Sequence, residues 1–131
     1  MKNTIKTALI TGAGSGIGRA VAQALAKDNW TLILTGRRKE TLEETAKICG
    51  QDNVLIYPSD ITSPESVNAL FDKVREKYGR LDLLFNNAGI NVPAVPLEDL
   101  SYEDWKKVID TNLTGAFLCT QPAFKLMKTQ S

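Results

Sequence analysis

The chain has 131 residues, of which 43% are hydrophobic and 24% charged, with a formal net charge of +1. This balance is typical of one globular domain with a buried core and gives no general field for nucleic acid or an acidic membrane surface. No apolar run approaches the roughly 20 residues of a membrane span, and Met1–Lys6 has no apolar stretch of signal-peptide length. We therefore expect a single domain over residues 1–131, cytoplasmic, with neither nucleic acid nor membrane as a partner.

Histidine is absent from the sequence and cysteine is sparse. The missing histidine removes the commonest general base and the commonest metal ligand, so we expect no metal site. Cys49 and Cys119 are widely separated, and each lies in a helical pattern. Both are therefore interpreted as small buried or half-buried side chains rather than as a disulfide or a nucleophile.

The first predicted strand, Ile5–Ile10, stops at a turn that holds four glycines in seven residues, and a helical pattern begins at Gly16. Glycines let the backbone turn sharply and approach a ligand, and the free N–H groups of a helix start favour an anion. The candidate phosphate-binding residues are Gly12, Gly14, Ser15, Gly16, Ile17 and Gly18. Ile17 stands where the G-x-G-x-x-G pattern has its third glycine, so an ordinary strand-to-helix turn is the alternative.

Strands and helices alternate along the rest of the chain. Three more short apolar runs predict strands over Trp30–Leu34, Val54–Tyr57 and Leu81–Phe85. Helical patterns follow over Lys39–Cys49, from Pro64 to the glycine at 79, and from Ser101 to about Lys128. A cap at Thr62 or Ser63 should begin the second of these helices, and Pro122 should kink or break the last one.

Strands that are apolar throughout are typical of a parallel sheet covered by helices on both faces. Right-handed crossovers then favour an α/β fold with a doubly wound sheet in the order 3-2-1-4. In such a sheet a ligand lies beyond the carboxyl ends of the strands. The segments rich in glycine or polar residues fall at those ends: 12–18, 36–38, 60–62 and 86–89.

The end of the second strand indicates which dinucleotide would bind. Folds that prefer NAD place a carboxylate there for the ribose hydroxyls, whereas this sequence has Gly36, Arg37 and Arg38. A guanidinium binds a 2′-phosphate that a carboxylate would repel. The pattern favours NADP over NAD, and the alternative is that both arginines are solvated ends of a turn.

The third and fourth strands are followed by further candidate residues. Asp60, next to Ile61, could accept a hydrogen bond from an adenine amino group, or it could cap the following helix. Asn86 and Asn87 could tie neighbouring loops together, and Ala88-Gly89 would let the backbone approach a ribose.

Asn112 lies within a predicted apolar stripe of the last helix, which consists of Trp105, Val108, Ile109, Leu113, Ala116 and Phe117. A buried amide is costly unless it is hydrogen-bonded. We therefore expect Asn112 to hold a water, to distort the helix locally or to bind a functional group.

Together these residues resemble the N-terminal half of the classical short-chain dehydrogenase/reductase family. The match consists of Thr11-Gly12-x-x-x-Gly16-Ile17-Gly18, Asp60, Asn86-Asn87-Ala88-Gly89 and Asn112, in the family's order and spacing. The resemblance implies a Rossmann-type fold and an NADP(H)-dependent oxidoreductase that moves a hydride between nicotinamide and a carbonyl or alcohol substrate. It also implies that Asn112 is the Asn of the catalytic tetrad, and that the protein is a homodimer or homotetramer through the helix at about 101–128.

The family's catalytic Ser and its Tyr-x-x-x-Lys unit lie beyond the tetrad Asn and have no counterpart in this chain. The string from Tyr102 to Lys106 precedes Asn112 and lies in the first turns of a helix, so it is interpreted as a solvated helical surface. The chain would therefore end before a fifth strand and be inactive alone, with a bare sheet edge that favours self-association. A non-catalytic NADP-binding or sensor module is the alternative, followed by an oligomerisation partner that uses the long helix only.

Overall fold

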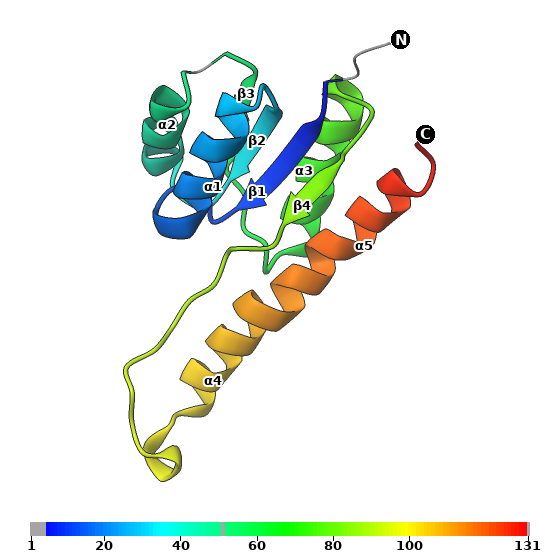
Figure 1. Cartoon of the computed structure of the whole chain (residues 1–131). Helices are drawn as coiled ribbons and strands as arrows, with labels where there is room; N and C mark the ends of the chain where they lie inside the picture. The colour runs from blue at the N-terminus through cyan, green and yellow to red at the C-terminus, as the bar shows by residue number, and fades with distance from the viewer. Residues whose placement is uncertain (1–4, 51, 131) are drawn as a thin grey trace.

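The computed structural model describes residues 5–50 and 52–130, and it contains one parallel sheet of four strands (Figure 1). The strands are β1 (Thr7–Thr11), β2 (Thr31–Thr35), β3 (Val54–Ile56) and β4 (Leu83–Phe85). Their order is β3-β2-β1-β4, which confirms the predicted doubly wound arrangement. β4 pairs with β1 and forms one edge of the described sheet, with Leu84 opposite Leu9.

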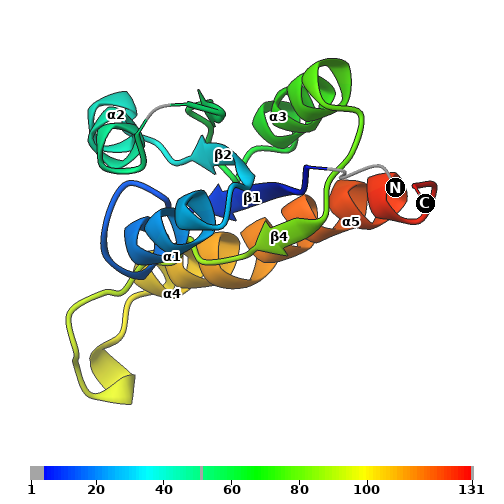
Figure 2. The ribbon, with the colours of Figure 1, turned by 45° about the horizontal axis from the view of Figure 1, so that its top comes forward.

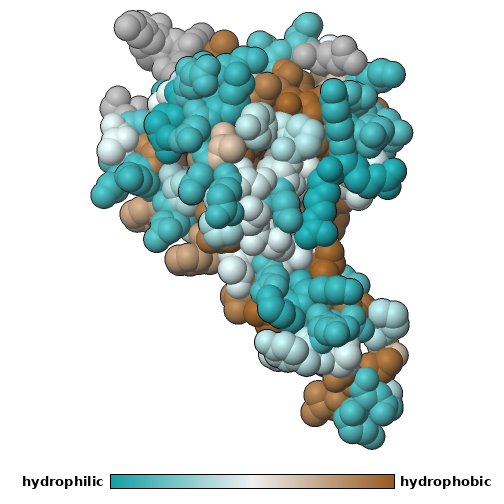
Figure 3. All heavy atoms as spheres, turned by 180° about the vertical axis from the view of Figure 1, so that it is seen from behind, coloured by the Kyte–Doolittle hydropathy of each residue, from teal (hydrophilic) through white to brown (hydrophobic). Residues whose placement is uncertain are grey.

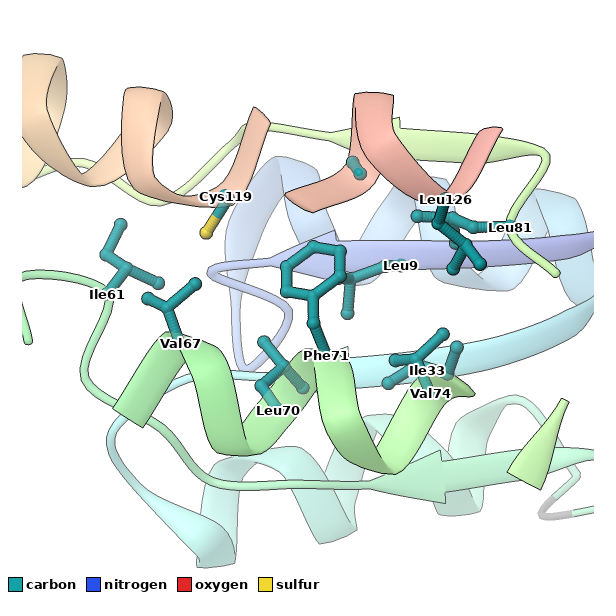
Figure 4. Close-up of a cluster of buried hydrophobic side chains, with 11 residues drawn as sticks. Leu9, Ile33, Ile61, Val67, Leu70, Phe71, Val74, Leu81, Cys119 and Leu126 are labelled. Atoms are coloured by element: carbon teal, nitrogen blue, oxygen red, sulfur yellow. The ribbon is translucent and has the colours of Figure 1, made fainter. Parts of the chain in front are cut away.

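Helices cover both faces of the sheet (Figure 2). On one face, α1 (Gly16–Lys27) and α2 (Lys39–Ile48) enclose a core cluster that includes Ile10 and Leu32. On the other face, α3 (Pro64–Lys77) and α5 (Gly115–Met127) pack over Leu9 and Ile33 of the sheet, with Phe71 of α3 in the same core (Figure 4). The alternate residues of β1 and β2 thus point to opposite cores, which explains why the three central residues of both strands are apolar.

The predicted start of α3 is confirmed. The Ser63 hydroxyl accepts a hydrogen bond from the Ser66 N–H at 3.3 Å, and Pro64 occupies the first turn, where its missing N–H costs nothing. The fourth strand is shorter than predicted. Asp82 precedes β4, and its carboxylate accepts the Thr7 N–H at 2.8 Å.

Residues 90–101 leave the body of the molecule as a long connection that contains the short 3-10 helix η1 (Leu97–Asp99) (Figure 1). Leu97 is 82% exposed, and Figure 3 shows hydrophobic side chains on the surface of this projecting part. The chain then enters α4 (Tyr102–Val108), where the Ser101 hydroxyl accepts the Asp104 N–H at 3.1 Å.

Of the kink or break predicted at Pro122, the break does not occur, because Pro122 lies inside α5. Proline leaves the Leu118 carbonyl without its usual helical partner, but Cys119 and Ala123 on either side are buried against α3, and this packing keeps the helix in register. The irregular turn lies earlier, in the π-helical segment η2 (Ile109–Thr114), which joins α4 to α5 and contains Asn112.

The long helix also buries a different face from the predicted one. Trp105, Leu113 and Phe117 of the expected apolar stripe are 53%, 64% and 58% exposed, and Asn112 is exposed as well. The buried side is made mainly of small residues: Thr111, Gly115, Cys119, Ala123 and Leu126. A Cβ at Gly115 would lie 2.7 Å from Cδ1 of Ile61, so a larger residue there would displace this buried side chain. Within the described ranges, no helix is both long and apolar enough to cross a bilayer.

Candidate functional site

A cavity of about 410 Å³ opens where the carboxyl ends of the four strands meet. Its walls come from the segments after β1, β2, β3 and β4, together with α2 and η2. The lining residues are Gly12, Gly14, Ser15, Thr35, Gly36, Arg37, Arg38, Thr41, Ser59, Ile61, Ala88, Gly89, Ile90 and Thr111. The cavity therefore brings together residues from all four segments that sequence analysis selected.

The glycine-rich turn divides into a lining part and a supporting part. Gly12, Gly14 and Ser15 face the cavity, whereas Gly16, Ile17 and Gly18 form the first turn of α1 outside its lining. Gly12 and Gly16 have φ values of 63° and 54°, which favour glycine. Gly18 packs against the turn itself, because a Cβ there would overlap the Gly12 carbonyl oxygen and lie 2.7 Å from Nδ2 of Asn87.

Arg37 and Arg38 line the cavity where β2 ends. The Arg37 guanidinium lies 3.4 Å from Oδ1 of Asp60, and both side chains are largely exposed. The carboxylate of Asp60 also accepts the Thr62 hydroxyl at 2.7 Å and the Thr62 N–H at 2.9 Å. These hydrogen bonds from Thr62 and, to a lesser extent, the charge of Arg37 hold the pKa of Asp60 below its ordinary value.

Asp60 does not line the cavity, whereas the adjacent Ile61 does. The bonds to Thr62 organise the turn that leads into α3. The helix cap that the sequence offered as the alternative role of Asp60 is instead supplied by Ser63.

Asn86 and Asn87 do not line the cavity, but they hold the segments that do. The Asn87 side-chain amide donates to the carbonyl oxygens of Thr11 at 3.2 Å and Gly12 at 3.1 Å. The backbone N–H groups of Asn87 and Ala88 both donate to the Thr11 hydroxyl, at 3.0 and 2.9 Å. Asn86 donates to the hydroxyl of Thr120 in α5 at 2.9 Å. The two amides therefore tie the end of β4 to the glycine-rich turn and to α5.

Asn112 holds the cavity-lining segment that contains Ile90. Its Oδ1 accepts the Ile90 N–H at 2.8 Å, and its Nδ2 donates to the Ile90 carbonyl at 3.0 Å. A Cβ at Gly89 would lie 3.3 Å from Asn112 Oδ1, so the segment passes close to this amide. Of the outcomes expected for Asn112, the local distortion of the helix is confirmed by the π-helical turn around it.

Several lining residues were missed by sequence analysis. Thr35 is buried, and its hydroxyl donates to the Tyr57 carbonyl at 2.7 Å and pairs with the hydroxyl of Ser59. Thr35 is the last residue of β2 and Ser59 follows β3, and these positions at strand ends were the sequence signal that could have identified them. Thr41 and Thr111 enter from helices, and only the fold brings them to the cavity.

Other reactive side chains lie outside the cavity lining. Tyr102 is 74% exposed. Nζ of Lys106 lies 2.5 Å from Oδ2 of Asp110, and the hydrogen bond and charge of this carboxylate raise the pKa of the lysine. Burial raises the pKa of Cys119 to about 11, so its thiol is protonated at neutral pH. Among residues 5–50 and 52–130, no group of three or more His, Cys, Asp or Glu could hold a metal.

Known proteins resemble this chain in sequence and in structure. A family model described as short chain dehydrogenase matches residues 6–131. An oxidoreductase of Staphylococcus aureus strain USA300, described as uncharacterized, is 37% identical over 128 residues, which are 98% of this chain and 55% of that protein. A 3beta-hydroxysteroid dehydrogenase of Mediterraneibacter gnavus is 40% identical over 94% of this chain and 45% of that protein.

Solved structures agree with these relatives. An alcohol dehydrogenase from the archaeon Thermococcus sibiricus, complexed with 5-hydroxy-NADP, matches with a TM-score of 0.87 and 35% identity over 93% of this chain and 53% of that one. A short chain dehydrogenase from Bacillus anthracis also gives a TM-score of 0.87, with 37% identity over 92% of this chain and 50% of that one. The chain thus spans about half the length of the relatives it matches.

Proposed function

The chain belongs to the short chain dehydrogenase family, and on that premise we propose that it forms the NADP(H) site of an oxidoreductase. The observation that carries this proposal is the convergence of a glycine-rich turn and an exposed arginine pair on one cavity at the carboxyl ends of parallel strands. The alcohol dehydrogenase from Thermococcus sibiricus is complexed with 5-hydroxy-NADP and shares the fold of this chain.

The residues that line the cavity fit a dinucleotide. Gly14 lines the cavity with backbone alone, so a phosphate can approach it closely. A Cβ there would lie 2.9 Å from Cβ of Thr41, so a larger residue would crowd α2. The backbone at the start of α1, with Ser15 before it, would hold the pyrophosphate. Ile61 would contact the adenine, while Ala88 and Gly89 would lie along a ribose.

Arg37 would select NADP(H) over NAD(H). Its side chain is 60% exposed, so it can turn from Asp60 to a 2′-phosphate without loss of a buried contact. A phosphate dianion would compete well with one carboxylate oxygen at 3.4 Å, because charge-assisted bonds to phosphate are short and frequently bidentate. Arg38 lines the same part of the cavity and would add positive charge there.

The bound nicotinamide would exchange a hydride with a carbonyl or alcohol carbon. The residues of this chain would bind and orient the cofactor. Asn112 would hold Ile90 by two hydrogen bonds, and so would fix the wall that follows Gly89. In the family this Asn belongs to the catalytic tetrad, and we assign that role to Asn112.

The test is the exchange of Arg37 for Asp, read with both cofactors. Loss of a charge-assisted bond and the new repulsion should weaken NADPH binding at least about tenfold, while NADH binding changes less than about threefold. Arg75→Asp, which alters an exposed arginine of α3 paired with Asp72, is the matched control. Equal loss of both cofactors would show that Arg37 does not read the phosphate.

We further propose that the exposed side of the long helix joins two copies of the protein. Leu113, Phe117 and Phe124 are 64%, 58% and 68% exposed along one continuous helix. Exposed apolar side chains in such a row favour association. Phe117→Asp should lower the mass measured by light scattering, whereas Val95→Asp on the projecting connection should leave it unchanged. A monomeric parent protein would contradict this assignment.

A further inference from the structure

Arg19 of α1 lies beside the glycine-rich turn but does not line the cavity. Its Nη2 donates to the Gly14 carbonyl at 2.6 Å and to the Thr41 carbonyl at 3.3 Å, and its Nε donates to the Thr45 hydroxyl at 3.0 Å. One guanidinium therefore joins the turn after β1 to two successive turns of α2. These contacts connect two segments that are separated by more than 20 residues of sequence.

The residues that Arg19 contacts are themselves fixed. The Thr45 hydroxyl is fully buried and donates to the Ala13 carbonyl at 2.8 Å. Thr41, one turn earlier, donates its hydroxyl to the Arg38 carbonyl at 3.0 Å. The network thus runs from the carbonyls of the glycine-rich turn, through Arg19 and α2, to the backbone of the arginine pair.

The side chain of Arg19 is suited to this bridging position. It is only 26% exposed, and three of its four acceptors are neutral oxygens of the turn and of α2. The fourth, Glu44, is 64% exposed and lies at the rim, 3.3 Å away. A planar guanidinium can reach several acceptors at once in a fixed geometry, which a lysine ammonium on a flexible stem cannot.

We propose that Arg19 is a positioning residue that sets the spacing between the glycine-rich turn and the Arg37-Arg38 segment. This inference rests on the proposed NADP(H) function, in which the first segment holds the 5′-phosphate of adenosine and the second holds its 2′-phosphate. A ligand that spans both segments gains from their fixed spacing, because the second contact then forms at a high effective concentration. A ligand that uses one segment gains nothing from it.

The experiment compares adenosine 2′,5′-bisphosphate, which spans both segments, with adenosine 2′-monophosphate, which reaches only the second. Both are titrated calorimetrically into the protein and its Arg19→Met variant, which keeps an unbranched apolar stem. We expect binding of the bisphosphate to weaken about tenfold, while the monophosphate changes less than about twofold. Arg75→Met removes an exposed arginine of α3 and should change neither affinity.

If the methionine variant does not fold, the same two titrations are made with Arg19→Lys. A lysine can keep one bond to the Gly14 carbonyl, so we expect a smaller loss that is again confined to the bisphosphate. Unchanged bisphosphate binding, or equal losses for both ligands, would overturn the positioning role. Failure of the unaltered protein to bind the bisphosphate would instead overturn the NADP(H) function itself.

Discussion

A methyl group added at Gly18 should destabilise the protein by disrupting the support of the glycine-rich turn. Its Cβ would overlap the Gly12 carbonyl oxygen and lie 2.7 Å from Nδ2 of Asn87 and 3.0 Å from the Gly12 carbonyl carbon. Two of these atoms belong to the backbone and cannot rotate away. The substitution therefore has to move the turn, the Asn87 amide or the start of α1.

The magnitude follows from these contacts. Overpacking a close-packed site costs about 1–3 kcal/mol. Displacing the Asn87 amide breaks its bonds to the Thr11 and Gly12 carbonyls, at about 1 kcal/mol each. Alanine recovers up to about 1 kcal/mol over glycine in a helix. We expect Gly18→Ala to lower the free energy of unfolding by roughly 2–4 kcal/mol.

Urea denaturation without cofactor measures this difference, with Gly36→Ala as the matched control. A Cβ at Gly36 would meet Cδ2 of Leu42 at 3.4 Å, an ordinary contact, so the control should stay near the parent protein. If Gly18→Ala unfolded within about 0.5 kcal/mol of the parent protein, the tight support of the turn by Gly18 would be refuted.

Two further predictions concern Asn112 and Cys119. Asn112→Ala should remove the hydrogen-exchange protection of the Ile90 amide and lower the free energy of unfolding by about 1 kcal/mol. Asn112→Asp keeps the acceptor and should keep most of the protection. Unchanged protection in the alanine variant would show that Asn112 does not hold Ile90. Burial raises the pKa of Cys119 from 9.0 to about 11, so the unfolded chain loses the thiol proton first and stability falls as pH rises from about 9 to 11. Cys119→Ala should lack that part of the decline in urea midpoint, and equal pH slopes in the two proteins would contradict the buried thiol.

The strand ends could be predicted from sequence because their signals are local. Gly12 and Gly36 stop apolar runs, and the carboxyl ends of parallel strands must meet at one edge of a sheet. The Ser63 cap of α3 was equally readable, since the hydroxyl and the N–H it accepts lie three residues apart.

The long helix was predicted, but its buried face was not, because that face depends on distant contacts. Its apolar side chains indicated one face, but close packing on Ile61 selected the face with Gly115 and left Phe117 outside. Asn112 and Ile90 are 22 residues apart, so their paired hydrogen bonds could not be read from local pattern. The same applies to Arg19, whose acceptors on α2 come together only in the folded chain.

The most direct test of the cofactor site is a calorimetric titration of the protein with NADPH and NADH at one ionic strength. The exposed guanidinium of Arg37 and the glycine-rich turn predict saturable binding of NADPH, at least about tenfold tighter than binding of NADH. Binding of neither cofactor, or NADH binding as tight as NADPH binding, would contradict the NADP(H) site.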